Sequence, residues 1–200
     1  MNLPPPIYKI IQQLEKLPSI GPRQAMRLAF YLIAQGQNEI KSFAQDLNSL
    51  LSVKNCAQCF FVHQNPDNLC DICGNKSRKK ELIAVLEKET DLISIERTKK
   101  FHGRYFILGP IAKTGILEEW QKLRLQNLKS FIQKELNGQA EEIILAFSPT
   151  ANGDFNVSLL IKELAPLAKK ISRLGRGLPT GGEIEFADDE TLGEALNNRG

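Results

Sequence analysis

Apolar residues recur at helical spacing through the first quarter of the chain. They stand three or four positions apart, which is the period that gathers apolar side chains on one face of an α-helix. The residues that carry the pattern are Ile7, Ile10, Ile11, Leu14, Ala25, Leu28, Ala29, Leu32, Ile40, Phe43 and Leu47. We therefore predict a small helical module at residues 1–52.

Short apolar runs then alternate with segments of helical period from residue 82 onward. The runs at residues 82–86, 105–108, 143–147 and 171–174 predict buried strands. The segments at residues 91–99, 117–136 and 156–169 predict helices between them. Strands and helices in this order indicate an α/β fold with a mainly parallel sheet at residues 81–174. A glycine-rich segment with a terminal helix should follow at residues 175–200.

Composition limits the class of protein. The chain has 200 residues, of which 42% are hydrophobic and 24% charged, as in ordinary globular proteins. Its apolar runs are shorter than the roughly 20 residues of a membrane span, and its first residues lack the features of a secretory signal. We expect a cytoplasmic, nucleoid-associated protein without membrane contacts. The net charge of +3 is too small to indicate nucleic-acid binding, so any basic surface requires local clustering.

Residues 53–80 contain all four cysteines, in two Cys-x-x-Cys pairs with ten residues between them. The pairs are Cys56 with Cys59 and Cys70 with Cys73. Four thiolates arranged in this way predict one structural Zn²⁺ per chain, because they complete its tetrahedral shell and leave no position for water. Two disulfides or a redox dithiol are the alternatives, but a reducing compartment disfavours disulfides and a redox motif needs only one pair. We expect His63, the rival ligand, on the surface of the loop.

The segment at residues 17–25 places a Pro-Gly-Pro turn between two helical patterns. Gly21 allows the backbone to approach a phosphate, and the N-terminus of the second helix offers N–H groups to that anion. Arg23 and Arg27 lie four positions apart, where they can neutralise neighbouring phosphates without reading bases. The segment resembles the helix-hairpin-helix element of DNA-binding proteins, which often has glycine at the position of Ser19. An αα-hairpin with two solvated arginines is the alternative.

Acidic residues follow two of the predicted strands. Glu87 follows the first strand, and Asp154 follows the third, at the edge where α/β sheets bind ligands. This part resembles a Toprim domain, in whose catalytic members a glutamate and an acidic pair hold Mg²⁺. Asn152 stands at the first position of that pair, so the resemblance implies a doubtful magnesium site and no enzymatic activity. The alternative is that Glu87 and Asp154 are exposed loop carboxylates.

The last part of the chain closely resembles the C-terminal signature of the bacterial RecR family. The resemblance lies in RLGRGLPTGGEIEFAD at residues 173–188 and TLGEAL at residues 191–196. Matching fragments between residues 95 and 109, together with the order of hairpin, cysteines and Toprim part, extend it over nearly the whole chain. In that family this region resembles a Walker B strand and takes part in subunit contacts. Because the sequence lacks a phosphate loop, we do not expect nucleotide binding.

The resemblance implies a non-catalytic recombination mediator. Family members are similar to rings in which dimers pair into tetramers around single- or double-stranded DNA, so that weak sites add up. The implied partners are RecO and, in some bacteria, RecF, and the implied task is loading RecA onto DNA coated by single-strand-binding protein. Two other classes stay open, namely a Toprim nuclease or topoisomerase-like enzyme and a pure protein-interaction adaptor. Tyr8, Tyr31 and Tyr105 lack a motif for a topoisomerase nucleophile.

Overall fold

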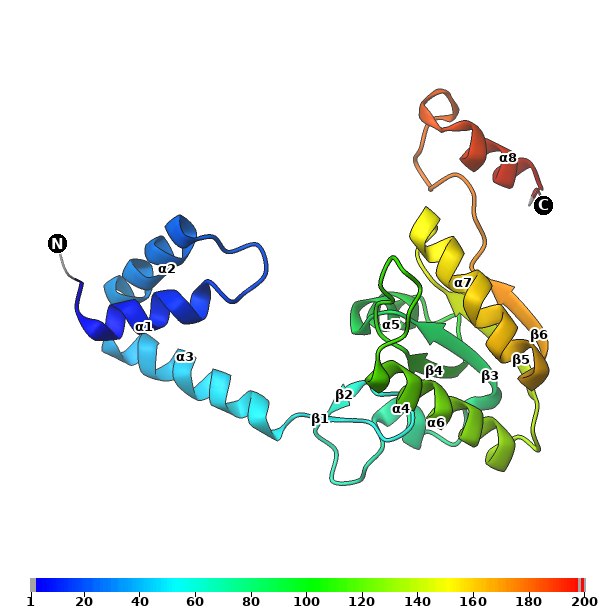
Figure 1. The fold of residues 1–200 in the computed structure, drawn as a ribbon, viewed down its shortest axis with the longest axis horizontal. Coiled ribbons are helices and arrows are strands. Elements are labelled where there is room, and N and C mark those ends of the chain that lie inside the picture. Colours follow the sequence, from blue (N-terminus) through cyan, green and yellow to red (C-terminus); the bar gives the residue numbers. More distant parts are fainter. Residues whose placement is uncertain (1–2, 198, 200) are drawn as a thin grey trace. The chain divides into compact units, whose positions relative to one another are not determined.

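The computed structural model describes residues 3–197 and 199, apart from the side chains of residues 151 and 152. The chain divides into two units, Met1–Val53 and Lys54–Gly200, each with its own core. Both are drawn in Figure 1, where colours follow the sequence.

Three helices form the N-terminal unit: α1 (Pro5–Leu14), α2 (Pro22–Gln35) and α3 (Gln37–Ser49), followed by the 3₁₀ turn η1 (Leu50–Ser52). Proline occupies the first turn of α1 and of α2, where its missing N–H costs nothing. The core is small, because α1 and α2 meet through Ile11, Ala25 and Ala29. The small alanines let the two helices approach closely.

The apolar faces of α2 and α3 are largely uncovered within this unit. Every residue of α3 is exposed, including Ile40, Phe43 and Leu47 of the predicted apolar face. Large side chains of α2 are exposed as well, among them Phe30 and Tyr31. The apolar period thus correctly predicted helices, but their own unit covers only part of the apolar surface.

The second unit begins with the cysteine segment. The short strands β1 (Lys54–Asn55) and β2 (Val62–His63) pair antiparallel, and the one-turn helix α4 (Asp71–Gly74) follows. The four cysteines are buried between these elements.

A four-stranded parallel sheet forms the centre of this unit (Figure 1). Its strands lie in the order β4 (Gly103–Ile107), β3 (Lys79–Leu86), β5 (Ala140–Ala146) and β6 (Ala168–Arg173). One face packs against α6 (Glu119–Glu135) and α7 (Ala151–Leu164), with Phe106, Ile132 and Leu160 in the core. The other face packs against α5 (Glu89–Arg97) and side chains of the cysteine segment. The predicted α/β class with a mainly parallel sheet is therefore confirmed.

The predicted bounds of α7 were wrong at both ends. The helix occupies residues 151–164 instead of 156–169, because the Thr150 side chain accepts a hydrogen bond from the Gly153 N–H (3.1 Å) and caps an earlier start. Pro166 then ends the helix in the 3₁₀ turn η2 (Ala165–Leu167), and Ala168 already begins β6. Asp154 consequently lies in the first turn of α7 and not in a loop.

The glycine-rich segment leads to the 3₁₀ turn η3 (Ile184–Phe186) and then to α8 (Asp189–Asn197), as the predicted terminal helix requires. None of the helices in the described part of the chain has the length and hydrophobicity needed to cross a membrane.

Candidate functional site

The turn between α1 and α2 leaves the start of α2 open to a ligand. Gly21 is the residue before the first turn of α2, and a Cβ added there would have no atom within 4 Å. No side chain of the described residues caps α2, so N–H groups of its first turn remain available to an anion. Ser19 adopts φ 66°, a left-handed conformation that glycine reaches at lower cost. This position therefore carries backbone strain that the glycine of similar hairpins would avoid.

Arg23 and Arg27 project from the beginning of α2. Both are exposed, and neither forms an ion pair with any residue that the structure describes. Ala25 and Ala29 on the same helix are buried against α1, which fixes the orientation of α2 in its unit. The turn thus combines free N–H groups with two free guanidinium groups, as phosphate binding requires. Their role as DNA contacts stays a prediction.

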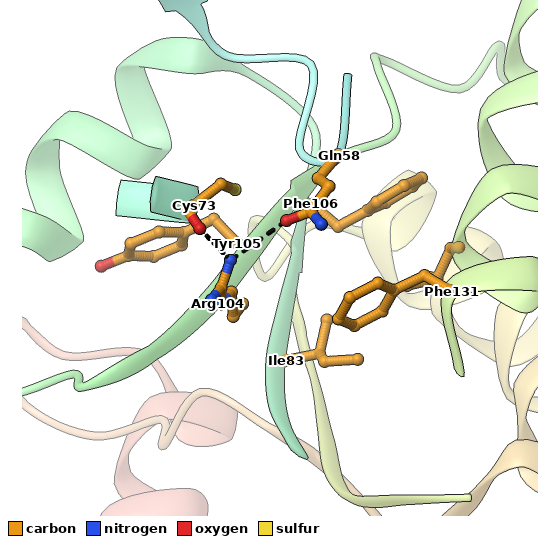
Figure 2. A pocket seen from close by; sticks show the side chains of 8 residues that line it. Gln58, Cys73, Ile83, Arg104, Tyr105, Phe106 and Phe131 are labelled. Carbon is orange, nitrogen blue, oxygen red and sulfur yellow. Dashed lines mark hydrogen bonds between the residues drawn. The ribbon is translucent and has the colours of Figure 1, made fainter. Parts of the chain in front are cut away.

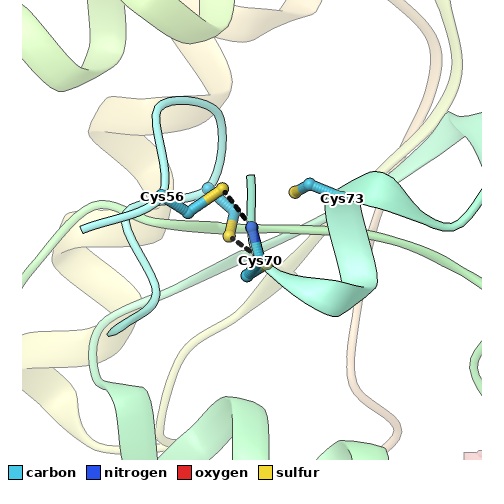
Figure 3. A group of neighbouring side chains, drawn as sticks. Cys56, Cys70 and Cys73 are labelled. Carbon is cyan, nitrogen blue, oxygen red and sulfur yellow. Dashed lines mark hydrogen bonds between the residues drawn. The ribbon is translucent and has the colours of Figure 1, made fainter. Parts of the chain in front are cut away.

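The structure brings the four cysteine sulfurs together. All of them lie within 4.8 Å of one another, and the thiols are almost completely buried. Figure 3 shows Cys56, Cys70 and Cys73 converging from the two ends of the segment. The Sγ atoms of Cys59 and Cys70 are 3.5 Å apart, much longer than the roughly 2.05 Å of a disulfide, and all four cysteines are free. The donor set fits a tetrahedral metal ion, whose sulfur ligands lie about 3.8 Å apart at the usual Zn–S distance.

Backbone groups prepare these sulfurs for a cation. The N–H of Phe61 donates to the Cys59 sulfur (3.5 Å), and the N–H of Cys70 donates to the Cys56 sulfur (3.4 Å). Hydrogen bonds among the cysteine side chains lower the pKa of Cys56, with Cys59 as the largest cause, and raise the pKa of Cys59, with Cys56 as the largest cause. Thiolates packed this closely repel one another, so that a bound cation is needed to keep them all ionised.

His63 does not join the cysteine cluster. It lies in β2, and its Nδ1 accepts a hydrogen bond from the N–H of Asn65 (3.2 Å). The expectation of a surface residue was wrong, because the side chain is half-buried and its Nε2 is shielded from solvent. The metal-ligating group in the described residues consists of the four cysteines.

The cysteine segment is fastened to β4, the edge strand of the sheet. Arg104 donates to the Gln58 side chain (3.0 Å) and to the carbonyl of Cys73, so that one guanidinium holds both cysteine pairs (Figure 2). The N–H of Ile107 donates to the carbonyl of Cys59 (2.9 Å). Phe60 packs edge-on against Phe106, with ring centres 5.5 Å apart. A metal at the cysteines would therefore also order one edge of the α/β core.

The two Toprim positions have different electrostatic surroundings. Partial burial raises the pKa of Glu87 above its ordinary value, and the carboxylate of Asp91 raises it further. Hydrogen bonds and ion pairs from Arg173 and Arg176 lower the pKa of Asp154. The Asp154 carboxylate is thus already neutralised by two guanidinium groups.

Two arginines compete with a magnesium ion for one of these carboxylates. Mg²⁺ is coordinated by carboxylate oxygens, and Arg173 of β6 and Arg176 both contact Oδ1 of Asp154. The side chain of Asn152 lies outside the described residues. Glu87 and Asp154 belong to none of the potential metal-binding groups in the part of the chain that the structure describes. Sequence patterns alone could not reveal Arg173 and Arg176 as partners of Asp154, because 19 and 22 positions separate them from it.

Comparison with known proteins identifies three family models along the chain. Residues 7–51 match the RecR helix-hairpin-helix model, residues 81–175 a Toprim domain model, and residues 177–199 the RecR C-terminal model. The chain is 39% identical to the recombination protein RecR of Chloroflexus aggregans, over 97% of this chain and 93% of that protein. It is also 39% identical to RecR of Synechococcus sp. (96% and 97% covered) and 35% identical to RecR of Frankia alni (96% and 95% covered). Since these relatives match nearly from end to end and the three models follow in order, the chain belongs to the RecR family of recombination proteins.

Proposed function

We propose that this protein is a non-catalytic mediator of recombinational DNA repair, which binds DNA without sequence preference as an assembled clamp. The observation that carries the proposal is the open N-terminus of α2 at Gly21, flanked by the free guanidinium groups of Arg23 and Arg27. Family membership supports the role in recombination.

Phosphate contacts explain why binding would not depend on sequence. A helix N-terminus and two arginines can hold backbone phosphates, which are the same at every base step. Arg23 and Arg27 lie one helical turn apart, so each can neutralise a neighbouring phosphate. Binding of this kind must weaken as salt rises, because it releases counterions from the DNA.

We infer that the cysteine centre holds one Zn²⁺ per chain in a structural role. Four buried thiolates would complete a tetrahedral shell and leave no open position for a catalytic water. The ion would stabilise the segment around β1, β2 and α4, which buries little else than the cysteines. Through Arg104, it would also stabilise the β4 edge of the sheet.

The absence of catalysis is the second part of the proposal. The two arginines that neutralise Asp154 and the amide at position 152 both disfavour the Mg²⁺ cluster of Toprim enzymes. Incubation with plasmid DNA and Mg²⁺ or Mn²⁺ should leave the DNA intact and supercoiled. Cleavage or relaxation that disappears in the Glu87→Ala variant would overturn this part.

The uncovered apolar faces of the N-terminal unit support assembly. Phe30, Tyr31 and Phe43 are between 45% and 60% exposed, more than the surface of a monomeric helical module requires. We propose that other copies of the chain cover them in dimers and tetramers, which would give several weak phosphate sites on one DNA molecule. RecO and, in some bacteria, RecF are the proposed partners in loading RecA onto DNA coated by single-strand-binding protein. Such a protein would act in the cytoplasm, at the nucleoid.

The test is the DNA affinity of the Arg23→Glu plus Arg27→Glu variant. We expect affinity for single-stranded and duplex DNA to fall at least tenfold, with a smaller salt dependence than in the parent protein. The matched control is Lys9→Glu plus Lys41→Glu, which changes the charge of the same unit equally at two exposed positions. An unchanged affinity in the arginine variant would refute DNA binding by the hairpin and favour a protein-interaction adaptor.

A further inference from the structure

Two segments of the second unit concentrate positive charge. Residues 76–80 (KSRKK) and 97–102 (RTKKFH) contain seven of the 26 lysines and arginines of the chain and neither aspartate nor glutamate. The rest of the chain therefore has 19 basic residues against 23 acidic ones. The small net charge of the chain thus hides a local excess of positive charge in these two segments.

The fold places these two segments side by side. The N–H of Lys79 donates to the carbonyl of His102 (3.0 Å), and Lys79 pairs with Gly103 in the register of β3 and β4. The Arg78 guanidinium donates to the carbonyl of Gly103 (3.0 Å) and forms an ion pair with Glu96. Both segments therefore meet at the end of the sheet where strands β3 and β4 begin.

Besides Arg78, these two segments carry six exposed cations. We call them the basic edge: Lys76, Lys79, Lys80, Arg97, Lys99 and Lys100. Lys80 lies 3.4 Å from Glu135, and the other five form no ion pair with any described residue.

At the same end of the sheet, where β5 and β6 begin, the lysines of β6 are paired with carboxylates. On β6, Lys169 pairs with Glu141 (2.7 Å) and Lys170 pairs with Glu142 (3.0 Å). In the half formed by β3 and β4, five of the six cations of the basic edge have no carboxylate partner among the described residues. Mutual repulsion of such charges destabilises a folded chain unless an anion offsets it.

Helix capping accounts for only one of these cations. Arg97 lies in the last turn of α5, where a positive charge interacts favourably with the helix dipole. Lys99 and Lys100 lie beyond the end of α5, and Lys76 and Lys79 belong to a different segment. Local structure therefore leaves most of the basic edge unexplained.

We propose that the basic edge is a second nucleic-acid-binding surface, which contacts backbone phosphates independently of the hairpin at Gly21. A nucleic-acid backbone needs only accessible cations, whereas a protein partner usually also requires a central apolar patch. The two segments expose no large apolar side chain, since their single aromatic residue, Phe101, is half-buried against Tyr105. The phosphate backbone is therefore the better match than an acidic protein segment.

This inference rests on the proposed DNA-binding function, but it concerns different residues in the other unit. A long DNA molecule can contact both surfaces, and the second contact then adds affinity without any change in the first. The two proposals can fail separately, because substitutions at the hairpin and at the basic edge test them one at a time.

The experiment compares two double variants of the full-length protein with the parent protein. Lys79→Gln plus Lys100→Gln removes one cation from each segment of the basic edge. The control, Lys113→Gln plus Lys162→Gln, removes two exposed lysines elsewhere in the same unit that have no carboxylate partner among the described residues. Affinity for labelled single-stranded and duplex oligonucleotides is measured by fluorescence anisotropy over a salt series, after thermal unfolding has shown that both variants are folded.

If both lysines contact duplex phosphates, the slope of log affinity against log salt becomes less steep by about 1.8. The ratio of the parent's DNA affinity to that of the variant should then fall about twelvefold between roughly 50 and 200 mM salt. The control should retain the parent's slope. An unchanged slope in the basic-edge variant, or an equal change in both variants, would overturn the proposal. A loss of DNA binding confined to the hairpin variant would overturn it while leaving the proposed function intact.

Discussion

Asn156 and Gln121 are both completely buried, at 0% and 1% exposure, but their amide groups have different surroundings. The Gln121 side chain donates to the carbonyl of Pro110 (2.9 Å) and accepts from the N–H of Glu118 (2.9 Å). Neither amide atom of Asn156 has a hydrogen-bond partner among the described residues. We therefore predict that apolar replacements at these two positions change stability in opposite directions.

The expected sizes follow from the cost of burying an amide. Asn156→Leu keeps the number and branching of side-chain heavy atoms and removes two unsatisfied polar atoms, which should stabilise the protein by about 1–3 kcal/mol. Gln121→Met keeps the length of the side chain but leaves the Pro110 carbonyl and the Glu118 N–H without their partner. It should destabilise the protein by about 1–3 kcal/mol. In a unit of this size, each kcal/mol corresponds to roughly 2–4 °C in Tm.

Urea and thermal unfolding of the zinc-loaded protein, followed by circular dichroism, measure both variants. Each free energy of unfolding is compared with that of the parent protein at the same protein concentration, because self-association would also raise Tm. A destabilising Asn156→Leu substitution would show that the amide has a favourable partner in the folded protein and is not unsatisfied. A neutral Gln121→Met substitution would equally contradict the energetic role of its two hydrogen bonds.

Three further predictions concern the turn, the acidic position and the cysteines. Ser19→Gly should raise the free energy of unfolding by about 0.5–1 kcal/mol, because relief of the left-handed strain exceeds the cost of the added entropy of the unfolded chain. A lower free energy of unfolding in urea would contradict this. The lowered pKa of Asp154 means that its pairing with Arg173 and Arg176 stabilises the protein above pH about 4 and is lost as the pH falls through the lower, folded-state pKa. Limited proteolysis below the folded-state pKa of Asp154 should therefore release the C-terminal segment. The Asp154→Asn variant should already release it at neutral pH. Cys59→Ser should abolish stoichiometric zinc uptake and lower Tm, whereas full uptake by that variant would exclude a four-thiolate site.

The sequence predicted the α/β core well because most residues in the apolar runs of β3, β4 and β5 are buried. Continuous apolar runs such as that of β3 have few alternatives to a central strand, and the observed strands include nearly all the predicted positions. The ends of α7 depended on other signals, namely the Thr150 cap and Pro166, which apolar periodicity does not register. In α3 the period predicted an apolar face, but periodicity cannot tell whether the same chain covers that face.

Some features of the candidate sites were likewise predictable from the sequence, and others were not. The cysteine cluster was predictable because two Cys-x-x-Cys pairs restrict the geometry by their spacing alone. The hydrogen bonds of Arg104 to the cysteine segment and the ion pairs of Asp154 were not predictable, because each joins residues that only the tertiary fold brings together. The basic edge was equally hidden, since its two segments meet through the register of β3 and β4.

We propose that several copies of this chain assemble on DNA and hold it through phosphate contacts. The decisive experiment is the molecular mass in solution, measured with and without duplex DNA over a salt series. We expect dimers or tetramers that bind DNA at low salt and release it as salt rises. A protein that remains monomeric under all these conditions, with or without DNA, would exclude assembly on DNA.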